Sequence, residues 1–245
     1  DATVTGAVFG VGVKTIPNYC FNRGKLEFID MPGAVRINNE AFHDCKSLRK
    51  VNMPAMEIIG YGALWACSAL ETVLPAIVPP GVTNIGYAAF YEDSKLTGCL
   101  TLEAKKKRDI TLPSNIQFVR TPITEIVVGR YQTTLTSEMF DGCTSVRKLY
   151  FKGKPTYQSN TFKNWGARQA IVYLPKDNAE WMAIFDDPEL FTPWENLNRD
   201  ITDTYLDRFP DETPPLGLLS SKANPANQWV KKWNPGPYSF KVILR

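Results

Sequence analysis

The sequence has few residues suited to catalysis: it contains one histidine, His43, in 245 residues. Histidine is the side chain most used for proton transfer near neutral pH, and it is a common metal ligand. No nucleophile or orienting carboxylate stands beside His43 in a recognisable motif, which favours a solvent-facing loop residue. The chain also lacks Cys-x-x-Cys pairs and a Gly-rich phosphate-binding loop. We therefore expect no enzymatic activity, no metal site and no cofactor.

Long apolar runs and an excess of one charge are also missing. No stretch reaches the roughly 18 consecutive apolar residues that a membrane-spanning helix needs. The 28 basic residues against 25 acidic ones give a net charge of +3, too small to indicate a nucleic-acid or membrane partner. No charged-then-apolar leader follows Asp1, so any secretion signal has been removed or was never present.

Five cysteines make an odd count, so at least one is unpaired within the chain. Three of them, Cys45, Cys67 and Cys143, occupy the same place in a repeated pattern. We expect these three to pack as small buried hydrophobes, and a disulfide framework is the less favoured alternative in a chain of this length.

The repeated pattern is clearest between Ile37 and Pro75. Its first copy is formed by Ile37, Ala41, Phe42, Cys45, Leu48, Val51, Met53 and Pro54, and its second by Ile59, Ala63, Leu64, Cys67, Leu70, Val73, Leu74 and Pro75. Rougher copies cover 16–32, 82–102, 135–151 and 161–175, and in the 82–102 copy Asp93 takes the place of cysteine. We expect Asp93 to be partly wet or to find hydrogen-bond donors, because burying a lone carboxylate is costly.

Each copy ends in a short alternating segment that predicts a strand closed by proline. The first apolar residues of these strands are Ile29, Val51, Val73, Leu100, Ile126, Leu149 and Val172, at intervals of 22 to 27 residues. Such a period is typical of a solenoid with stacked parallel strands. The Ile-x-x-x-Ala-Phe-x-x-Cys segment spaces its apolar residues by three and four, which predicts one or two helical turns facing the strands.

These residues resemble a known repeat family. Ile59-Gly60-Tyr61-Gly62-Ala63-Leu64 with Cys67 and Leu70, and 85–90, are similar to the leucine-rich repeat of the BspA-like type. The resemblance covers about 5–176, and 76–81 and 103–134 depart from it. It implies an α/β fold, a right-handed β–α superhelix of about seven parallel strands, in a secreted or surface-exposed bacterial protein that is usually tied to adhesion. It supplies no catalytic residue.

Two regions fall outside the regular pattern. Within the irregular stretch 103–134, the alternating segments 100–102 and 110–112 suggest a β-hairpin whose tip carries Lys105, Lys106, Lys107 and Arg108. This run is a possible contact for a phosphate or an acidic partner, or simply a solvated loop tip. We assign 1–176 to the array and 177–245 to a capping helix with a Pro- and Trp-rich tail, in which 238–244 alternates like a strand of unknown position.

The residues between the inward apolar positions of each strand should form an outer sheet face, which solenoids commonly use for binding. They are Asp30, Asn52, Thr101, Val127, Tyr150 and Tyr173, with Phe28, Lys50, Thr72, Glu125 and Lys148 one pleat earlier. As ligand-binding residues we select Asn52, Thr101, Val127, Lys148, Tyr150 and Tyr173. The alternative for the two tyrosines is that the C-terminal segment covers them.

The function expected from these features is non-enzymatic binding or adhesion at the cell surface, to an extracellular protein or glycan, with host-derived molecules among the candidate ligands. The first alternative is a structural spacer or display module within a longer chain. The second is a carbohydrate-active enzyme that uses the acidic cluster Asp186, Asp187 and Glu189, although adjacent loop carboxylates are usually solvated. The sequence does not specify the ligand or the oligomeric state.

Overall fold

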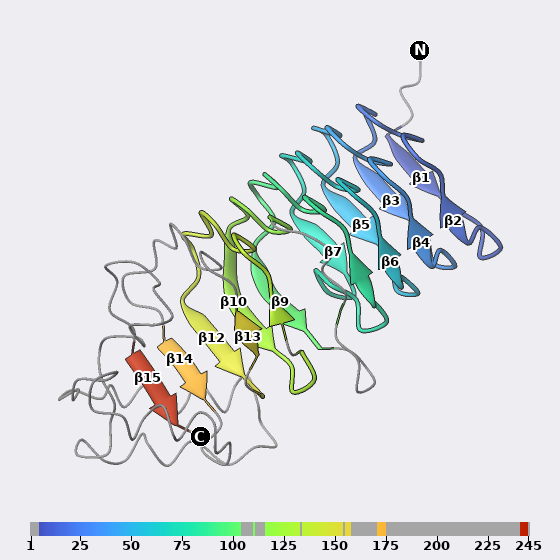
Figure 1. The fold of residues 1–245 in the computed structure, drawn as a ribbon. Coiled ribbons are helices and arrows are strands. Elements are labelled where there is room, and N and C mark those ends of the chain that lie inside the picture. The colour runs from blue at the N-terminus through green and yellow to red at the C-terminus, as the bar shows by residue number, and fades with distance from the viewer. Residues whose placement is uncertain are drawn as a thin grey trace.

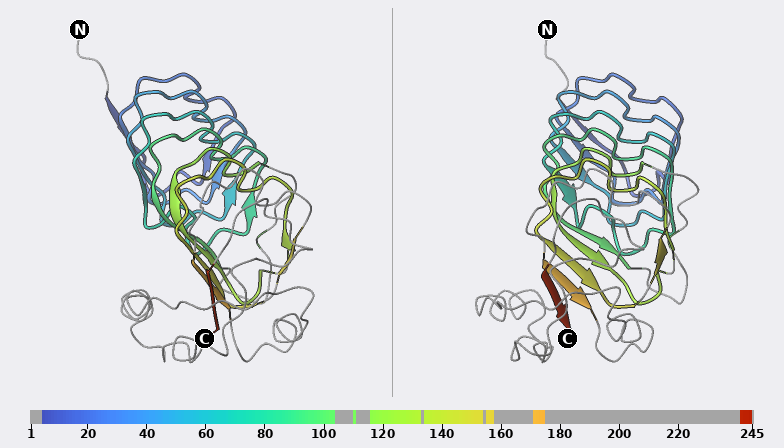
Figure 2. Two further views of the ribbon diagram at one scale, coloured as in Figure 1. Left: turned by 90° about the vertical axis from the view of Figure 1, so that its left-hand side faces the viewer. Right: turned by 60° about the vertical axis from the view of Figure 1, so that its left-hand side comes forward.

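The computed structural model describes residues 5–103, 110, 116–132, 134–153, 155–157, 171–174 and 241–244. Within these residues the chain winds into a solenoid, in which each repeat forms one rung and successive rungs stack along one axis (Figure 1). The view turned by 90° shows the rungs as superimposed coils, with the long strands on one side (Figure 2). The predicted solenoid of parallel strands is confirmed.

The long strands form the sheet face in two parallel sheets. The first sheet contains β1 (Gly6–Val8), β3 (Phe28–Asp30), β5 (Lys50–Asn52) and β7 (Thr72–Leu74). The second contains β9 (Gly98–Leu102), β10 (Ile123–Val128), β12 (Lys148–Phe151), β14 (Ile171–Leu174) and β15 (Lys241–Leu244). The sequence left the position of the strand-like segment 238–244 open, and the structure shows that β15 pairs in parallel with β14.

The register of the strands agrees with the repeat read from the sequence. Ile29 aligns with Val51, and Val51 with Val73. In the second sheet the aligned positions are Leu100, Ile126, Leu149 and Val172. The strands that contain Val73 and Leu100, β7 and β9, do not pair with each other, so the sheet face is divided between them. The inserted segment 76–81 lies between these two strands in the sequence and returns Ile77 and Val78 to the core.

Pairs of very short strands form a second ladder on another side of the coil. They are β2 (Thr15–Ile16), β4 (Arg36–Ile37), β6 (Ile58–Ile59) and β8 (Asn84–Ile85), and farther along the axis β11 (Thr134–Leu135) pairs with β13 (Thr156–Tyr157). Their second residues Ile16, Ile37, Ile59, Ile85 are fully buried. These side chains fill the space between the two ladders.

The expected helical turns are not present, because no helix occurs among the described residues. In the second rung the segment after β4 instead carries two residues with left-handed backbone, Glu40 (φ 50°) and Asp44 (φ 58°). Two left-handed residues four positions apart also occur in the other described rungs, at 19/23, 62/66, 88/92, 116/120 and 138/142. A left-handed residue every four positions prevents helix formation, so the α/β class and the β–α superhelix are not found here.

Hydrogen bonds between rungs take the place of helical ones in this segment. Glu40, Phe42 and Asp44 donate their N–H groups to carbonyls of the next rung at 2.8, 2.9 and 2.8 Å. The residues between them bond within the turn, as His43 does to the Glu40 carbonyl. The three- and four-residue spacing of apolar side chains suggested a helix. It arises instead from a non-helical segment in which residues four positions apart have left-handed backbone. None of the described segments forms a helix long and apolar enough to cross a bilayer.

The cysteine position has a hydrogen-bonding role in addition to packing. Cys45, Cys67 and Cys143 are fully buried, as expected, and each thiol donates to the carbonyl of a phenylalanine in the preceding rung at 3.0 to 3.1 Å. Burial raises the pKa of Cys143 to about 12, so this thiol keeps its proton at neutral pH. In the fifth rung Thr121 occupies the same position and donates its hydroxyl to the Phe90 carbonyl at 2.7 Å.

Asp93 is the exception in this column of donors. It is fully buried, and its Oδ1 accepts the Cys67 N–H at 2.9 Å. No described group forms a hydrogen bond with its Oδ2. Burial, only partly offset by the bond from the Cys67 N–H, raises the pKa of Asp93 well above its usual range. The expectation that Asp93 finds donors is thus met at one oxygen only, and a bound proton on the other removes the cost of a buried charge.

The position of Asp93 predicts how stability depends on pH. In the unfolded chain the carboxyl group of Asp93 has a pKa of about 3.9. The stability that Asp93 contributes is therefore complete below that pH, and it is lost as the pH rises toward the higher pKa that the group has in the folded protein. Asp93→Asn keeps the acceptor, supplies an amide donor and carries no charge. We expect it to stabilise the protein at pH 7 by about 1–3 kcal/mol, with the gain shrinking toward pH 4. Chemical denaturation of both proteins across this pH range measures the difference.

A matched control is Asp44→Asn in the turn of the second rung. Asp44 lies 3.3 Å from Lys46 Nζ and 3.7 Å from Arg23 Nε, and it should gain nothing when its charge is removed. A gain for Asp93→Asn that stays constant between pH 4 and pH 7 would show that the carboxyl is not protonated in the folded state.

Candidate functional site

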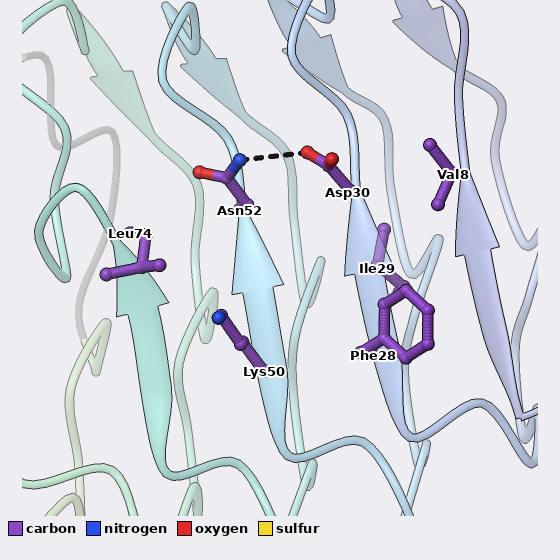
Figure 3. Close-up of a pocket in the computed structure, with 7 residues that line it drawn as sticks. All are labelled: Val8, Phe28, Ile29, Asp30, Lys50, Asn52 and Leu74. Atoms are coloured by element: carbon purple, nitrogen blue, oxygen red, sulfur yellow. Dashed lines mark hydrogen bonds between the residues drawn. The ribbon is translucent and has the colours of Figure 1, made fainter.

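A cleft of about 420 Å³ crosses the sheet face of the first sheet. Its side chains come from four neighbouring strands: Val8 on β1, Phe28 and Asp30 on β3, Lys50 and Asn52 on β5, and Leu74 on β7 (Figure 3). The core residue Ile29 completes the lining. The cleft therefore extends along the solenoid axis and across the strands.

Two of the apolar side chains of the cleft are open to solvent. Val8 is 70% exposed and Phe28 is 42% exposed, whereas the isoleucine beside Phe28 is buried in the core. The Phe28 ring lies over Gly6, and a Cβ atom placed on Gly6 would collide with the ring carbons Cε1 and Cζ. The missing side chain at Gly6 thus gives the ring the space that it occupies on the sheet face. Aromatic residues, including phenylalanine, are enriched at the centres of protein interfaces.

The polar side chains of the cleft differ in whether they have hydrogen-bond or ion-pair partners. Asn52 donates its amide Nδ2 to Asp30 Oδ1 at 2.8 Å, and Figure 3 shows this bond across the two strands. Lys50 is exposed, and its ammonium group forms no ion pair with any described residue. The Asp30 carboxylate therefore accepts a hydrogen bond from a neutral amide and keeps its negative charge, while the Lys50 ammonium group faces the solvent.

Leu74 lines the cleft because of a register that the sequence reading missed. The repeat alignment placed Leu74 in the buried position of Met53, whereas the structure pairs Leu74 with Asn52. The 22-residue offset continues through Leu74, and the chain shortens only after it. The Leu74 side chain consequently points to the outer side, where it is half-buried.

The other residues predicted for the binding face have varied surroundings. Thr101 and Lys148 are half-buried, and Lys148 Nζ lies 3.2 Å from Glu125 Oε1. Val127 is 1% exposed and so offers almost no surface. The basic run 105–108 lies outside the described residues, as do the predicted capping helix and the acidic cluster near Asp187.

Tyr150 and Tyr173 do not form an open contact surface. Both are fully buried, and their rings stack with centroids 4.4 Å apart and planes 12° apart. This corrects the expectation of exposed tyrosines at this end of the sheet face. The outward direction of a side chain on a strand follows from alternation, but its exposure depends on what packs above it, which alternation does not specify.

His43 belongs to an aromatic column on the turn side. Its ring lies 4.8 Å from the Trp65 ring, which in turn contacts Tyr91 at 5.6 Å. Glu40 Oε2 and Asn22 Nδ2 each lie 3.3 Å from His43 Nδ1. His43 is half-buried, with its ring tilted by 35° against the Trp65 ring, and is not the solvent-facing loop residue that we expected. Among the described residues no group of three or more metal-binding side chains comes together.

A family model describes most of this chain. Six copies of the BspA type leucine rich repeat region match residues 14–147 and 111–177. No curated protein matches the chain significantly.

Solved structures of repeat proteins are also similar to the chain. The pneumococcal vaccine antigen PcpA is 16% identical with a TM-score of 0.46, and the match covers 71% of this chain and 36% of that protein. A leucine-rich repeat protein from Bacteroides ovatus is 16% identical with a TM-score of 0.28, over 66% of this chain and 60% of that one. A leucine rich cell surface protein from Faecalibacterium prausnitzii is 14% identical with a TM-score of 0.29, over 71% and 74%. The chain thus spans less than two thirds of the length of the first two proteins.

The contact between Gly6 and Phe28 predicts how the cleft can be reshaped without removing any of its groups. Gly6→Ala should push the Phe28 ring off its place and change the ring's NMR signals. Gly10→Ala is the matched control, because no atom lies within 4 Å of a Cβ at that position. Equal spectra for Gly6→Ala and the wild type would show that the ring does not rest on Gly6.

Proposed function

The chain belongs to the BspA-type leucine-rich-repeat family, and we propose that it is a non-enzymatic, extracellular or cell-surface module that binds a macromolecule through the first four strands of its sheet face. The observation that carries this proposal is the cleft of about 420 Å³ with its exposed Phe28 and Val8. Solenoids bind with extended surfaces of this kind. Adhesion is the biological role that such binding would serve.

The arrangement of the rungs supports binding more than catalysis. The strands that carry the cleft side chains are fixed by parallel ladders, so the side chains keep their spacing without a ligand. A rigid surface loses little conformational entropy when it binds, which favours affinity. The cleft contains one carboxyl group, Asp30, whereas hydrolysis of a glycoside ordinarily needs two.

The exposed part of the sheet face differs from the part first selected from the sequence. Asn52 remains in the proposed site, and Phe28, Lys50, Val8 and Leu74 join it. Thr101 and Lys148 are kept as outlying contacts on the second sheet. Tyr150 and Tyr173 are no longer included because they are buried.

The proposal is tested by removing the cleft groups and, separately, similar groups elsewhere. We expect Phe28→Ala with Lys50→Ala to weaken binding to ligands identified on extracellular-protein and glycan arrays by about tenfold or more. The control is Tyr19→Ala with Lys46→Ala, which removes one exposed aromatic residue and one exposed lysine from the turn side. Circular dichroism and thermal unfolding verify that both variants are folded.

Two outcomes would contradict the proposal. Array ligands that bind both variants equally well would place the binding surface outside the cleft. Absence of any ligand for the folded wild-type protein would favour a spacer or display role within a longer surface protein.

A further inference from the structure

We propose that the solenoid has a hinge between its third and fourth rungs, so that the rungs up to β7 and the rungs from β8 onward tilt against each other and open on the sheet face. This inference concerns the motion of the array and does not depend on the proposed binding role. It is carried by an imbalance in the contacts at this junction, because the turn side is tied by directional contacts and the sheet face is not.

The sheet face has no strand pairing at this junction. β7 and β9 are both fully described and do not pair with each other, whereas the long strands on either side of them pair in parallel with their neighbours. After β1, β3 and β5 the next residue donates its N–H group to a carbonyl of the following rung, at 2.8 Å for Phe9, 3.0 Å for Met31 and 2.9 Å for Met53. Pro75 takes the same position after β7, and proline has no N–H group to donate. The ladder is therefore interrupted at Pro75.

The first residue of β9 and the inserted segment 76–81 also leave this junction adaptable. Gly98 has a φ of 114°, a conformation that residues with a Cβ atom rarely adopt, and no atom beyond its chain neighbours would lie within 4 Å of a Cβ placed there. Ile77 and Val78 of the inserted segment are buried in the core. Contacts between apolar side chains have no preferred direction, so they hold the two parts together without fixing the angle between them.

The turn side of the same junction is tied closely. Three backbone hydrogen bonds of 2.8 to 3.0 Å cross it, from the N–H groups of Gly62, Leu64 and Ala66 to the carbonyls of Tyr87, Ala89 and Tyr91. The rings of Tyr61 and Tyr87 stack across it with centroids 5.5 Å apart, and the rings of Trp65 and Tyr91 meet edge to face at 5.6 Å. The short strands β6 and β8 also pair. Hydrogen bonds are directional, so this side is the axis about which the two parts tilt.

The hinge divides the sheet face into two parts with different consequences for binding. The residues that line the cleft lie on β1, β3, β5 and β7, which all belong to the first part. Thr101 and Lys148 lie on β9 and β12 in the second part. Tilting leaves the shape of the cleft unchanged and moves the two outlying residues relative to it. The length of sheet face that one ligand can contact therefore varies with the hinge angle.

The test measures distances between pairs of spin labels by pulsed electron paramagnetic resonance. The labels are attached to introduced cysteines in a protein that carries Cys20→Ser and Cys99→Ser, because the other three cysteines are fully buried. The reporting pair is Lys50→Cys with Glu125→Cys, which lies three strand steps apart on the sheet face and spans the hinge. We expect its distance distribution to be about twofold wider than those of two control pairs.

The control pairs separate the hinge from general flexibility. Val8→Cys with Leu74→Cys is also three strand steps apart on the sheet face, but it lies entirely within the first part. Lys46→Cys with Arg120→Cys spans the same junction on the turn side, and both side chains are exposed. Circular dichroism verifies that each labelled protein is folded.

Three results would overturn the inference. A reporting pair as narrow as the control within the first part would show that the array is rigid across β7 and β9. A turn-side pair as wide as the reporting pair would show that this side is not the axis. A wide distribution for the control within the first part would show that the motion is not confined to this junction. Ligand binding by the cleft is tested separately by the Phe28 and Lys50 double variant.

Discussion

The structure depends on the backbone hydrogen bonds that join each rung to the next. In the turn segments the N–H groups of alternate residues donate to carbonyls of the following rung, as Phe42 does to Ala63 and Leu64 does to Ala89. An isolated rung would leave these groups without partners, and a buried unpaired amide is costly. The rungs therefore form as a stack, and the positions of the sheet-face side chains follow from that stack. The ladder in the turns continues from Ala66 to Tyr91, past the point where the sheet between β7 and β9 is divided.

The apolar repeat predicted the strands well, because burial on one side of a strand requires alternation and fixes the register. The alignment of Ile29, Val51 and Val73 follows directly from it. The same pattern misled at the turns, where Ala41, Phe42 and Cys45 are spaced as in a helix but follow a chain with left-handed residues at Glu40 and Asp44. Glutamate and aspartate carry no sequence signal for such a conformation as strong as glycine would. The donor role of the cysteine position also needed coordinates, although its replacement by Asp93 and Thr121 hints at a polar function.

The candidate site was only partly visible in the sequence. Alternation identified Asn52, Phe28 and Lys50 as outward residues, but it gave no reason to separate them from Tyr150 and Tyr173. The difference is one of packing, because the tyrosines are buried and Phe28 is exposed. Gly6 and Leu74 could not be recognised, since the role of Gly6 depends on the Phe28 ring above it. The shortening of the repeat beside Leu74 also left two registers open.

The pairing of β15 with β14 bears on how the chain folds. Paired residues on neighbouring strands of the sheet face are 22 to 26 positions apart in the sequence, whereas Ile171 of β14 and Lys241 of β15 are 70 positions apart. Bringing two strands together across the larger separation costs about 1 kcal/mol more conformational entropy than across one rung. The rungs can add one after another from any starting point, but the last strand has no template until β14 is in place. We therefore expect β15 to dock late in folding, after the rungs before it have formed most of their native contacts.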